Sequence, residues 1–269
     1  NLVKRLLKEG NQVRVLDNES RGKKGRLAQE LSHIEIIEGD IRNSNIVEKA
    51  VKGCAIVVHM AYINGTEFFY SKPELVPEDV SLVVPDVHNP RFSYGGGKII
   101  SELLAINYGR KDFDRVLIIR PHNVFGPDMG WEHVIPQFSV RAYERHQKQP
   151  VGPLAFPIQG EGKETRAFVV IEDFIEGLML AMEKGGHQEI YHIGTEEEIT
   201  IGDVAKKIVN YFGREIDLRT GPITQGSATR RCPDISKLKK IGYRPKYTFD
   251  EALAHSIKWY IDHKDEQPG

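Results

Sequence analysis

Tyr94 and Lys98 are two residues whose types and spacing could do chemistry together. They are four positions apart and precede an apolar run at residues 99–105, which predicts a helix that carries both side chains on one face. An ammonium close to a phenol favours the phenolate and lowers the pKa of the tyrosine from about 10 toward neutrality. Such a tyrosine can take a proton from an alcohol. The alternative is a helix start with two unrelated exposed residues, and the motif alone leaves both open.

Three predicted strands before this helix end in residues that could hold a ligand. Residues 12–16 predict a strand that ends at Asp17, residues 34–40 alternate and end at Asp40, and the apolar strand 55–59 leads to Ala61. An acid in the position of Asp17 accepts hydrogen bonds from ribose hydroxyls in a dinucleotide-binding βαβ unit. A turn-forming acid after a strand is the alternative. In a doubly wound sheet all three ends would lie at the ligand-binding edge.

The composition argues against several classes of function. The 269 residues carry a formal net charge of -1, so no basic surplus exists to bind nucleic acid or an acidic membrane. No apolar run approaches the roughly 20 residues of a spanning helix, and no signal peptide opens the chain. Cys54 and Cys232 are far apart and the ten histidines form no ligand-spaced cluster. We therefore expect no disulfide framework, no metal, no membrane or nucleic-acid partner, and a cytoplasmic location.

The rest of the chain alternates between short strands and amphipathic helices. Residues 150–162 are rich in proline and glycine and suit a hairpin or a substrate loop. Thr200 is expected to cap the helix that follows it. The other predicted elements are strands at 115–120, 165–171 and 190–194 and helices that begin near residues 134, 172, 201 and 249.

The spacing between His59 and Tyr94 is too short for the expected fold. A parallel crossover needs about 30 residues, yet no further helix and apolar strand can be found there. The glycine-rich phosphate turn of a dinucleotide-binding unit would precede Asn1. We therefore expect that this turn, and one helix and strand between about residues 75 and 77, are missing from the 269 residues. An intact mass of the expressed protein above 30.5 kDa would support this expectation.

Several short motifs occur in order along nearly the whole chain: Asp17-Asn18, Gly39-Asp40, His59-Met60-Ala61, Tyr94-x-x-x-Lys98, Arg120-x-x-Asn123-Val124-Phe125-Gly126-Pro127, Gly160-x-Gly162-x-x-Thr165-Arg166 and Arg231-x-Pro233-Asp234. Together they resemble the extended short-chain dehydrogenase/reductases, and within these the nucleotide-sugar epimerase, dehydratase and decarboxylase group. Their joint occurrence is far more specific than any single motif.

The resemblance implies an NAD cofactor at the carboxyl edge of a Rossmann sheet. Tyr94 would be the catalytic base, and Lys98 would hold the nicotinamide ribose and lower the pKa of the tyrosine. Asp17 matches the acid that binds the adenosine ribose, which favours NAD because the 2′-phosphate of NADP would be repelled. The other cofactor-binding positions that the resemblance implies are Asn18, Asp40, Ile41 and Ala61.

The resemblance also implies a nucleotide-diphosphate sugar as substrate. Asn123 matches a residue that hydrogen-bonds the diphosphate. Arg166 and Arg231 match two arginines that grip the nucleotide part, and the guanidinium fork suits a diphosphate. The serine or threonine that shares the substrate hydroxyl with the tyrosine is absent, and its strand is the one missing before Val76.

The expected fold is α/β, with a Rossmann-like doubly wound parallel sheet and a smaller C-terminal substrate-binding lobe. Residues 1–125 would form the NAD-binding domain and residues 126–269 mostly the lobe, with 163–193 returning to the first domain. A homodimer is expected from the family likeness.

The expected activity is transient oxidation at the sugar C4, which gives a 4-keto sugar. Return of the hydride to the opposite face gives an epimerase, which we favour because it needs no further residue. A 4,6-dehydratase, a uronic acid decarboxylase and a simple ketone reductase are enzyme alternatives. A non-catalytic NAD-binding sensor is the alternative of another class.

A few other polar residues allow two interpretations. His59 and His122 each follow an apolar strand and are expected to be packed rather than catalytic. Glu132 and His133 could select the sugar or only cap the next helix. Arg230, next to Arg231, is expected to be solvated, with one of the pair binding the ligand.

Overall fold

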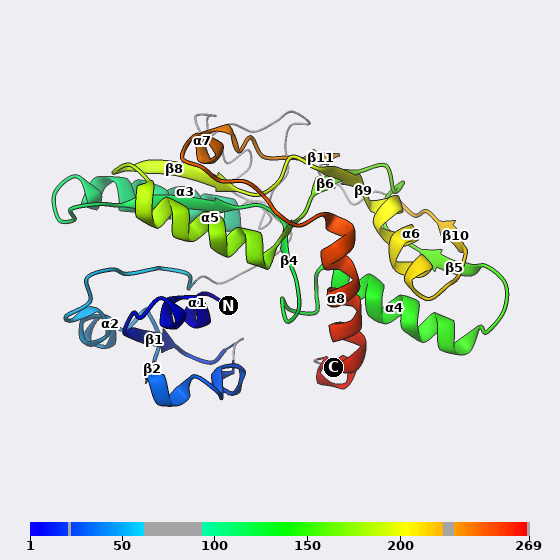
Figure 1. Cartoon of the computed structure of the whole chain (residues 1–269), viewed down its shortest axis with the longest axis horizontal. Helices are drawn as coiled ribbons and strands as arrows, with labels where there is room; N and C mark the ends of the chain where they lie inside the picture. Colours follow the sequence, from blue (N-terminus) through cyan, green and yellow to red (C-terminus); the bar gives the residue numbers. More distant parts are fainter. Residues whose placement is uncertain (21–22, 62–92, 223–228, 268–269) are drawn as a thin grey trace. The chain divides into compact units, whose positions relative to one another are not determined.

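The computed structural model describes residues 1–20, 23–61, 93–222 and 229–267, without the side chains of residues 93–95 (Figure 1). The chain divides into two compact units, Asn1–Asn64 and Gly65–Gly269. Within the described residues, no helix has the length and apolar character needed to cross a bilayer.

The first unit is built on two parallel strands, β1 (Val13–Asp17) and β2 (Ile34–Glu38), in a register that places Asp17 opposite Glu38. The helices α1 (Leu2–Lys8) and α2 (Ser44–Val51) pack against β1. Two 3-10 turns, η1 (Lys24–Leu27) and η2 (Leu31–His33), lead into β2. Because the strands are parallel, their carboxyl ends meet at one edge of this unit.

The apolar segment 55–59 differs from its prediction, because it pairs with no strand among the described residues. Its side chains are exposed: Ile56 is 63% and Val57 56% accessible. In a doubly wound sheet of order 3-2-1-4, the fourth strand pairs with the first. Counting β1 and β2 as the second and third strands, the partner of segment 55–59 would be the strand that leads into the glycine-rich turn.

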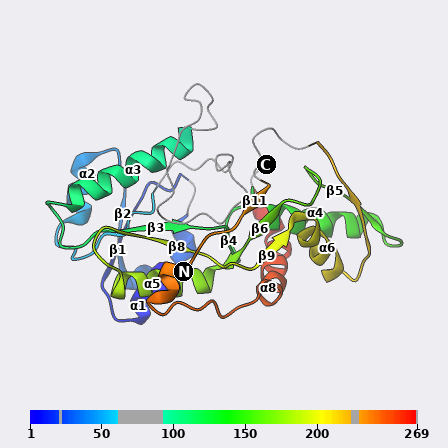
Figure 2. The ribbon, with the colours of Figure 1, turned by 90° about the horizontal axis from the view of Figure 1, so that it is seen from above.

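The second unit contains another parallel pair, β3 (Leu117–Pro121) and β8 (Glu189–Ile193), which lies between two helices (Figure 2). Helix α3 (Ser93–Gly109) covers one face and α5 (Ile171–Lys184) the other. The His122 amide donates to the Ile193 carbonyl at 3.0 Å, so the pairing continues just beyond the carboxyl end of β3.

Short strands join this layer to the lobe. The predicted strand 165–171 is split at Phe168, because β6 (Thr165–Ala167) and β7 (Val169–Val170) have different partners. Strand β7 pairs in parallel with β4 (Val124–Phe125). Strand β6 lies between β11 (Arg230–Arg231), which is parallel, and β9 (Glu198–Thr200), which is antiparallel.

The proline-rich segment 150–162 is not a hairpin. It contains β5 (Leu154–Pro157), which pairs in parallel with the distant strand β10 (Ile216–Arg219). The hairpin prediction failed because the partner of a four-residue strand is chosen by tertiary packing rather than by the local turn sequence.

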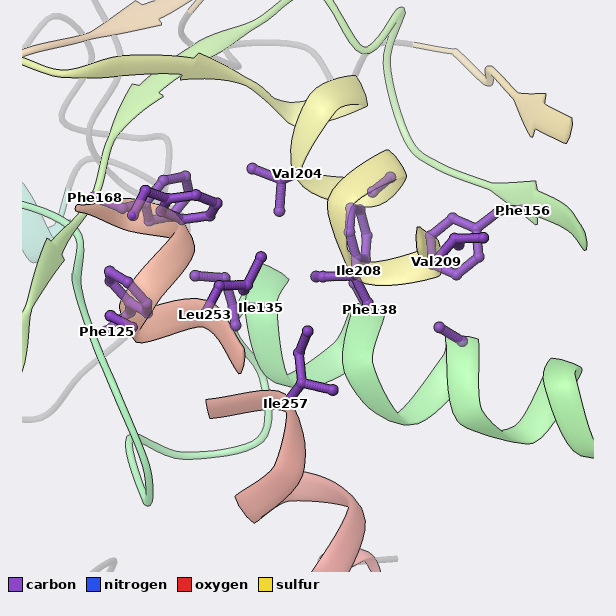
Figure 3. Packing of buried hydrophobic residues seen from close by; sticks show 14 of the residues in the cluster. Phe125, Ile135, Phe138, Phe156, Phe168, Val204, Ile208, Val209, Leu253 and Ile257 are labelled. Carbon is purple, nitrogen blue, oxygen red and sulfur yellow. The ribbon is translucent and has the colours of Figure 1, made fainter. Parts of the chain in front are cut away.

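The lobe is held together by three helices, α4 (Val134–Lys148), α6 (Ile201–Tyr211) and α8 (Phe249–Asp262). Their apolar faces meet β5 and the segment of β4 and β7 in one core (Figure 3). Burying an aliphatic or aromatic side chain of this kind contributes about 1.5–3 kcal/mol. Its fully buried members include Phe125, Ile135, Ala142, Leu154, Phe156, Val204, Ile208 and Ile257.

Capping residues fix the ends of the lobe helices. Thr200 accepts a hydrogen bond from the Asp203 amide at 3.0 Å, which confirms the predicted cap of α6. Thr248 and Glu251 form a reciprocal capping box at the start of α8. A short helix, α7 (Ser236–Lys240), and a final 3-10 turn, η4 (Lys264–Glu266), complete the unit.

Helix α8 also holds the loop that follows β4. The fully buried Tyr260 accepts a hydrogen bond from the Met129 amide at 2.7 Å through its hydroxyl, which also lies 3.5 Å from the Gly126 carbonyl oxygen. The Trp131 ring lies edge-on to Tyr260, with centroids 5.0 Å apart. Gly126 itself leaves no room for a side chain, since a Cβ there would lie 2.7 Å from Ile171.

Candidate active site

Helix α3 carries the Tyr94 and Lys98 pair. Both residues lie in one continuous helix that begins at Ser93, so the three intervening glycines do not break it. The side chain of Tyr94 lies outside the described residues. Lys98 is partly buried, and this burial lowers the pKa of its ammonium, while the carboxylate of Glu102 one turn later opposes the shift.

Glu102 joins this helix to the sheet through a bidentate ion pair. The guanidinium of Arg120, near the end of β3, donates to its two carboxylate oxygens at 2.9 and 2.8 Å. A further nitrogen of Arg120 lies 3.4 Å from Nε2 of His192 on β8. The pair therefore connects α3 with both strands of the layer.

His122 and His192 form a compact pair at the carboxyl end of β3 and β8. Their ring centroids are 4.6 Å apart. Burial lowers the pKa of His122 to about 3, and the neighbouring charges of His192, Arg120 and Arg231 act in the same direction. His122 is therefore neutral at physiological pH, which agrees with the prediction of a packed histidine.

Arg166 and Arg231 come together although they are far apart in the sequence. Strands β6 and β11 are parallel neighbours, and these two residues are register partners. Side chains in register on adjacent strands share a face, and the strands are about 4.8 Å apart. Two arginines in register on neighbouring strands suit a diphosphate, whose oxygens accept bidentate hydrogen bonds.

Asn123 is bound to the same group of strands. Its side-chain amide donates to the Ala167 carbonyl at 3.0 Å, and the Val169 amide donates to its backbone carbonyl at 3.3 Å. Asn123 has a φ of 39°, a left-handed conformation that asparagine tolerates better than most residues. The structure therefore brings Asn123 beside β6, the strand that carries Arg166.

Arg230 is only partly solvated, because its side chain is paired and 30% exposed. Its guanidinium binds both carboxylate oxygens of Glu198 on β9, with Nε 2.9 Å from Oε2, and this pairing lowers the pKa of Glu198. Because alternate residues of a strand face opposite sides, Arg230 and Arg231 point to different faces of the sheet. The fold thus separates two adjacent arginines, one that binds Glu198 and one on the face of the sheet that carries Arg166.

The first unit gathers four of the expected cofactor residues at one edge. Asp17 ends β1, and its Oδ1 accepts from the Glu19 amide at 2.6 Å. The side chain of Asn18 donates to Asp40 at 3.1 Å. Three hydrogen bonds from Arg42 and this one hold the pKa of Asp40 well below its usual range. The remaining member, Ile41, is 42% exposed.

These residues fit a dinucleotide. Asp17 is exposed, so its carboxylate can accept hydrogen bonds from a ribose. The exposed Ile41 beside the Asp40 carboxylate offers an apolar contact for an adenine. Ala61 is also exposed but follows the unpaired segment 55–59, so the described structure does not bring it to the Asp17 edge by strand pairing.

Sequence reasoning missed Glu102 and His192. The signal for Glu102 was its position four residues after Lys98, on the face that carries the Tyr94 and Lys98 pair. For His192 only its place in an apolar strand was visible. His133 occupies the N-cap position of α4, as one of its two interpretations expected, but its side chain makes no capping hydrogen bond. Among the residues described, no group of three potential ligands is placed to hold a metal ion.

Comparisons with known proteins bear on this arrangement. Residues 64–194 match the model of the NAD dependent epimerase/dehydratase family, and residues 1–74 match that of the 3-beta hydroxysteroid dehydrogenase/isomerase family. A dTDP-glucose 4,6-dehydratase of Streptomyces niveus is 25% identical over 95% of this chain and 85% of its own. The chain belongs to the extended short-chain dehydrogenase/reductases.

Other relatives of this short-chain dehydrogenase/reductase carry several activities in their names. A trifunctional UDP-glucose 4,6-dehydratase/UDP-4-keto-6-deoxy-D-glucose 3,5-epimerase/UDP-4-keto-L-rhamnose-reductase of Arabidopsis thaliana is 26% identical over 86% of this chain. The chain spans about a third of that protein's length. UDP-glucuronic acid decarboxylases and UDP-glucose and UDP-glucuronic acid 4-epimerases also occur among the matches.

The solved structures confirm the predicted Rossmann-like fold. The crystal structure of a dTDP-glucose 4,6-dehydratase from Streptomyces venezuelae, with NAD and TYD bound, superposes with a TM-score of 0.84. It is 24% identical, and the match covers 99% of this chain and 94% of the other. The family is thus NAD dependent, and it includes epimerases, dehydratases and decarboxylases of nucleotide sugars.

Proposed function

We propose that this chain is an NAD-dependent nucleotide-sugar epimerase that acts by transient oxidation at the sugar C4. The observation that carries the proposal is the register pairing of Arg166 and Arg231 beside Asn123, in a chain of this family. Two adjacent guanidinium groups and an amide suit the diphosphate that all nucleotide sugars share.

The residues of both units have separate roles in this reaction. Asp17, Asn18, Asp40 and Ile41, with Ala61, would hold NAD, which when bound supplies the acceptor for the hydrogen of the sugar C4. Tyr94 takes the proton of the 4-hydroxyl as a general base. The ammonium of Lys98 holds the nicotinamide ribose and favours the tyrosine phenolate.

The 4-keto sugar has more than one fate. Return of hydrogen to the opposite face of C4 inverts the centre and requires no group beyond those of the oxidation step, which favours an epimerase. Elimination of water across C5 and C6 is the second candidate, because several of the similar proteins are 4,6-dehydratases. Loss of a C6 carboxylate would make the chain a decarboxylase, as some relatives are named.

Mass spectrometry of a panel of nucleotide sugars, incubated with the full-length protein and NAD, tests the proposal. A product of unchanged mass and new retention time identifies an epimerase. Loss of water or carbon dioxide replaces that activity by one of the others. A Tyr94→Phe variant should lose nearly all turnover, and a variant that keeps NAD binding while the wild type converts no sugar would instead indicate a sensor.

The outer face of α3 supports a homodimer. Ile100, Leu103, Leu104 and Tyr108 follow helical spacing and are each more than half exposed, between 51% and 59%. Apolar faces of this kind mark protein interfaces, and we propose a second copy as the occupant. Light scattering should give a dimer mass, Leu103→Glu should give a monomer, and the equally apolar but remote control Val151→Glu should remain dimeric.

A further inference from the structure

We propose that Glu102 and Arg120 are positioning residues, which lock helix α3 to the sheet so that Tyr94 and Lys98 are held in place for proton transfer. The inference rests on the proposed function of that pair. Neither residue is expected to touch the substrate.

The ion pair has the geometry of a rigid connection. The guanidinium of Arg120 donates to both oxygens of Glu102 at 2.9 and 2.8 Å. The two side chains are only 16% and 18% exposed, so solvent screens the pair weakly. Removal of one partner from such a pair leaves an uncompensated, mostly buried charge.

Apolar packing holds α3 only weakly. Of the described residues of this helix, 96–109, Gly109 alone is buried. Its large apolar side chains at 100, 103, 104 and 108 face away from the sheet and are exposed. Glu102 lies at the centre of the inner face, between the partly buried Ile99 and Ile106. A polar contact therefore occupies the place where a helix would normally bury a large side chain.

The position of this contact matches the needs of the catalytic pair. Glu102 is one turn from Lys98 and two turns from Tyr94, about 6 and 12 Å along the helix axis. On the other side, Arg120 lies next to the last residue of β3 and is also 3.4 Å from His192 on β8. The ion pair thus connects the middle of α3, one turn after Lys98, to the carboxyl edge of the sheet, where Rossmann folds bind their ligands.

A second contact of α3 supplies a matched control. The side-chain amide of Gln188 donates to the Ile106 carbonyl at 2.9 Å, at the end of the helix away from Lys98. Gln188 has a φ of 61°, which asparagine tolerates well. Gln188→Asn therefore shortens the side chain and breaks this contact without adding backbone strain.

Steady-state kinetics and amide hydrogen exchange of three full-length variants test the proposal. Glu102→Gln should lower kcat about 10- to 100-fold, as expected for a small misplacement of catalytic groups, while KM changes less than about twofold. Arg120→Lys keeps the charge but loses the planar fork of the guanidinium, so its kcat should lie between those of the wild type and Glu102→Gln. Gln188→Asn should keep the wild-type kcat.

Hydrogen exchange reports how firmly the Glu102–Arg120 ion pair holds α3, and this readout does not depend on turnover. Amides at residues 96–101 should exchange faster in Glu102→Gln, whereas in Gln188→Asn the increase should be confined to the last turns of α3. Wild-type kcat in Glu102→Gln, or an equal loss in Gln188→Asn, would overturn the positioning role. If the wild type converts no nucleotide sugar, the proposed function fails. In that case, unchanged exchange at residues 96–101 in Glu102→Gln would overturn the inference that the Glu102–Arg120 ion pair holds α3 in place.

Discussion

Replacing Arg166 or Arg231 by glutamine should weaken the binding of nucleoside diphosphates, whichever base the substrate carries. The two arginines are register partners on β6 and β11, so both guanidinium groups face the same side of the sheet. Glutamine keeps much of the aliphatic stem and removes the charge and the planar fork. The perturbation is therefore aimed at the phosphate contact rather than at packing.

The size of the effect follows from the type of bond that is lost. A hydrogen bond to a charged partner contributes about 1.5–3 kcal/mol, which corresponds to a rise in Kd of about 10- to 150-fold for each variant. Because the two residues are neighbours, their effects should not be additive, and a double-mutant cycle should give a coupling of about 0.5–3 kcal/mol. A higher salt concentration screens the phosphate charge and should therefore narrow the difference in Kd between the wild type and the variants.

Isothermal titration calorimetry with UDP and with dTDP measures these affinities directly. Arg230→Gln is the matched control, because Arg230 is adjacent in the chain but faces the other side and binds Glu198. It should leave Kd within about twofold and lower the free energy of unfolding by no more than about 1 kcal/mol. The reasoning is refuted if Arg230→Gln weakens binding as much as Arg231→Gln, or if neither Arg166→Gln nor Arg231→Gln changes Kd.

Three further predictions concern the cofactor, the loop after β4 and the histidine pair. Asp17→Ala should raise the affinity for NADPH relative to NADH at least about tenfold, because it removes both a ribose acceptor and a charge that repels the 2′-phosphate. Fluorescence titrations of both cofactors measure the two affinities, and an unchanged ratio between them contradicts the prediction. Tyr260→Phe should lower the free energy of unfolding by about 1–3 kcal/mol, since the Met129 amide loses its acceptor; urea denaturation measures the loss. The pKa of His122 is about 3 when folded and near 6.5 when unfolded, so the unfolded state binds more protons between these values. The free energy of unfolding should therefore fall as the pH drops below 6.5, by up to about 1.4 kcal/mol per unit, and a slope that persists in His122→Gln would exclude this histidine as its source.

The sequence predicted those features that depend on neighbouring residues. The helix with Tyr94 and Lys98, the cap at Thr200 and the polar ends of β1 and β2 all have local signals, and the structure contains each of them. The motifs also identified the family, since their order along the chain is specific even where each motif alone is weak.

Other features depend on contacts between distant segments, and the sequence could not supply them. Strands β6 and β11 have three and two residues, too few for a periodic pattern, so the register of Arg166 and Arg231 was not visible. The motif resemblance pointed to Arg231, but the sequence could not show that Arg230 faces the other side and binds Glu198. The ion pair of Glu102 and Arg120 was missed because charged residues are usually read as solvated.

Segment 55–59 shows the opposite failure, in which a strong local signal is not realised. Its apolar run has the composition of a central parallel strand, yet it stays exposed and unpaired among the described residues. Strand propensity becomes structure only when a neighbouring strand offers its backbone groups. Among the matched relatives, two decarboxylases of Arabidopsis thaliana and two bacterial proteins align over more than 290 positions with 95 or 96% of this 269-residue chain. Each of these alignments therefore holds positions without a counterpart here.

The place of α8 in the lobe core has a consequence for how the protein is made. Phe249, Leu253 and Ile257 close a core whose other walls include α4 and α6, which the ribosome produces earlier (Figure 3). At synthesis rates of about 5–20 residues per second, the apolar face of α4 waits roughly ten seconds for this last wall. During that interval the nascent lobe exposes aromatic and aliphatic surface, and it is then that chaperones have most to protect.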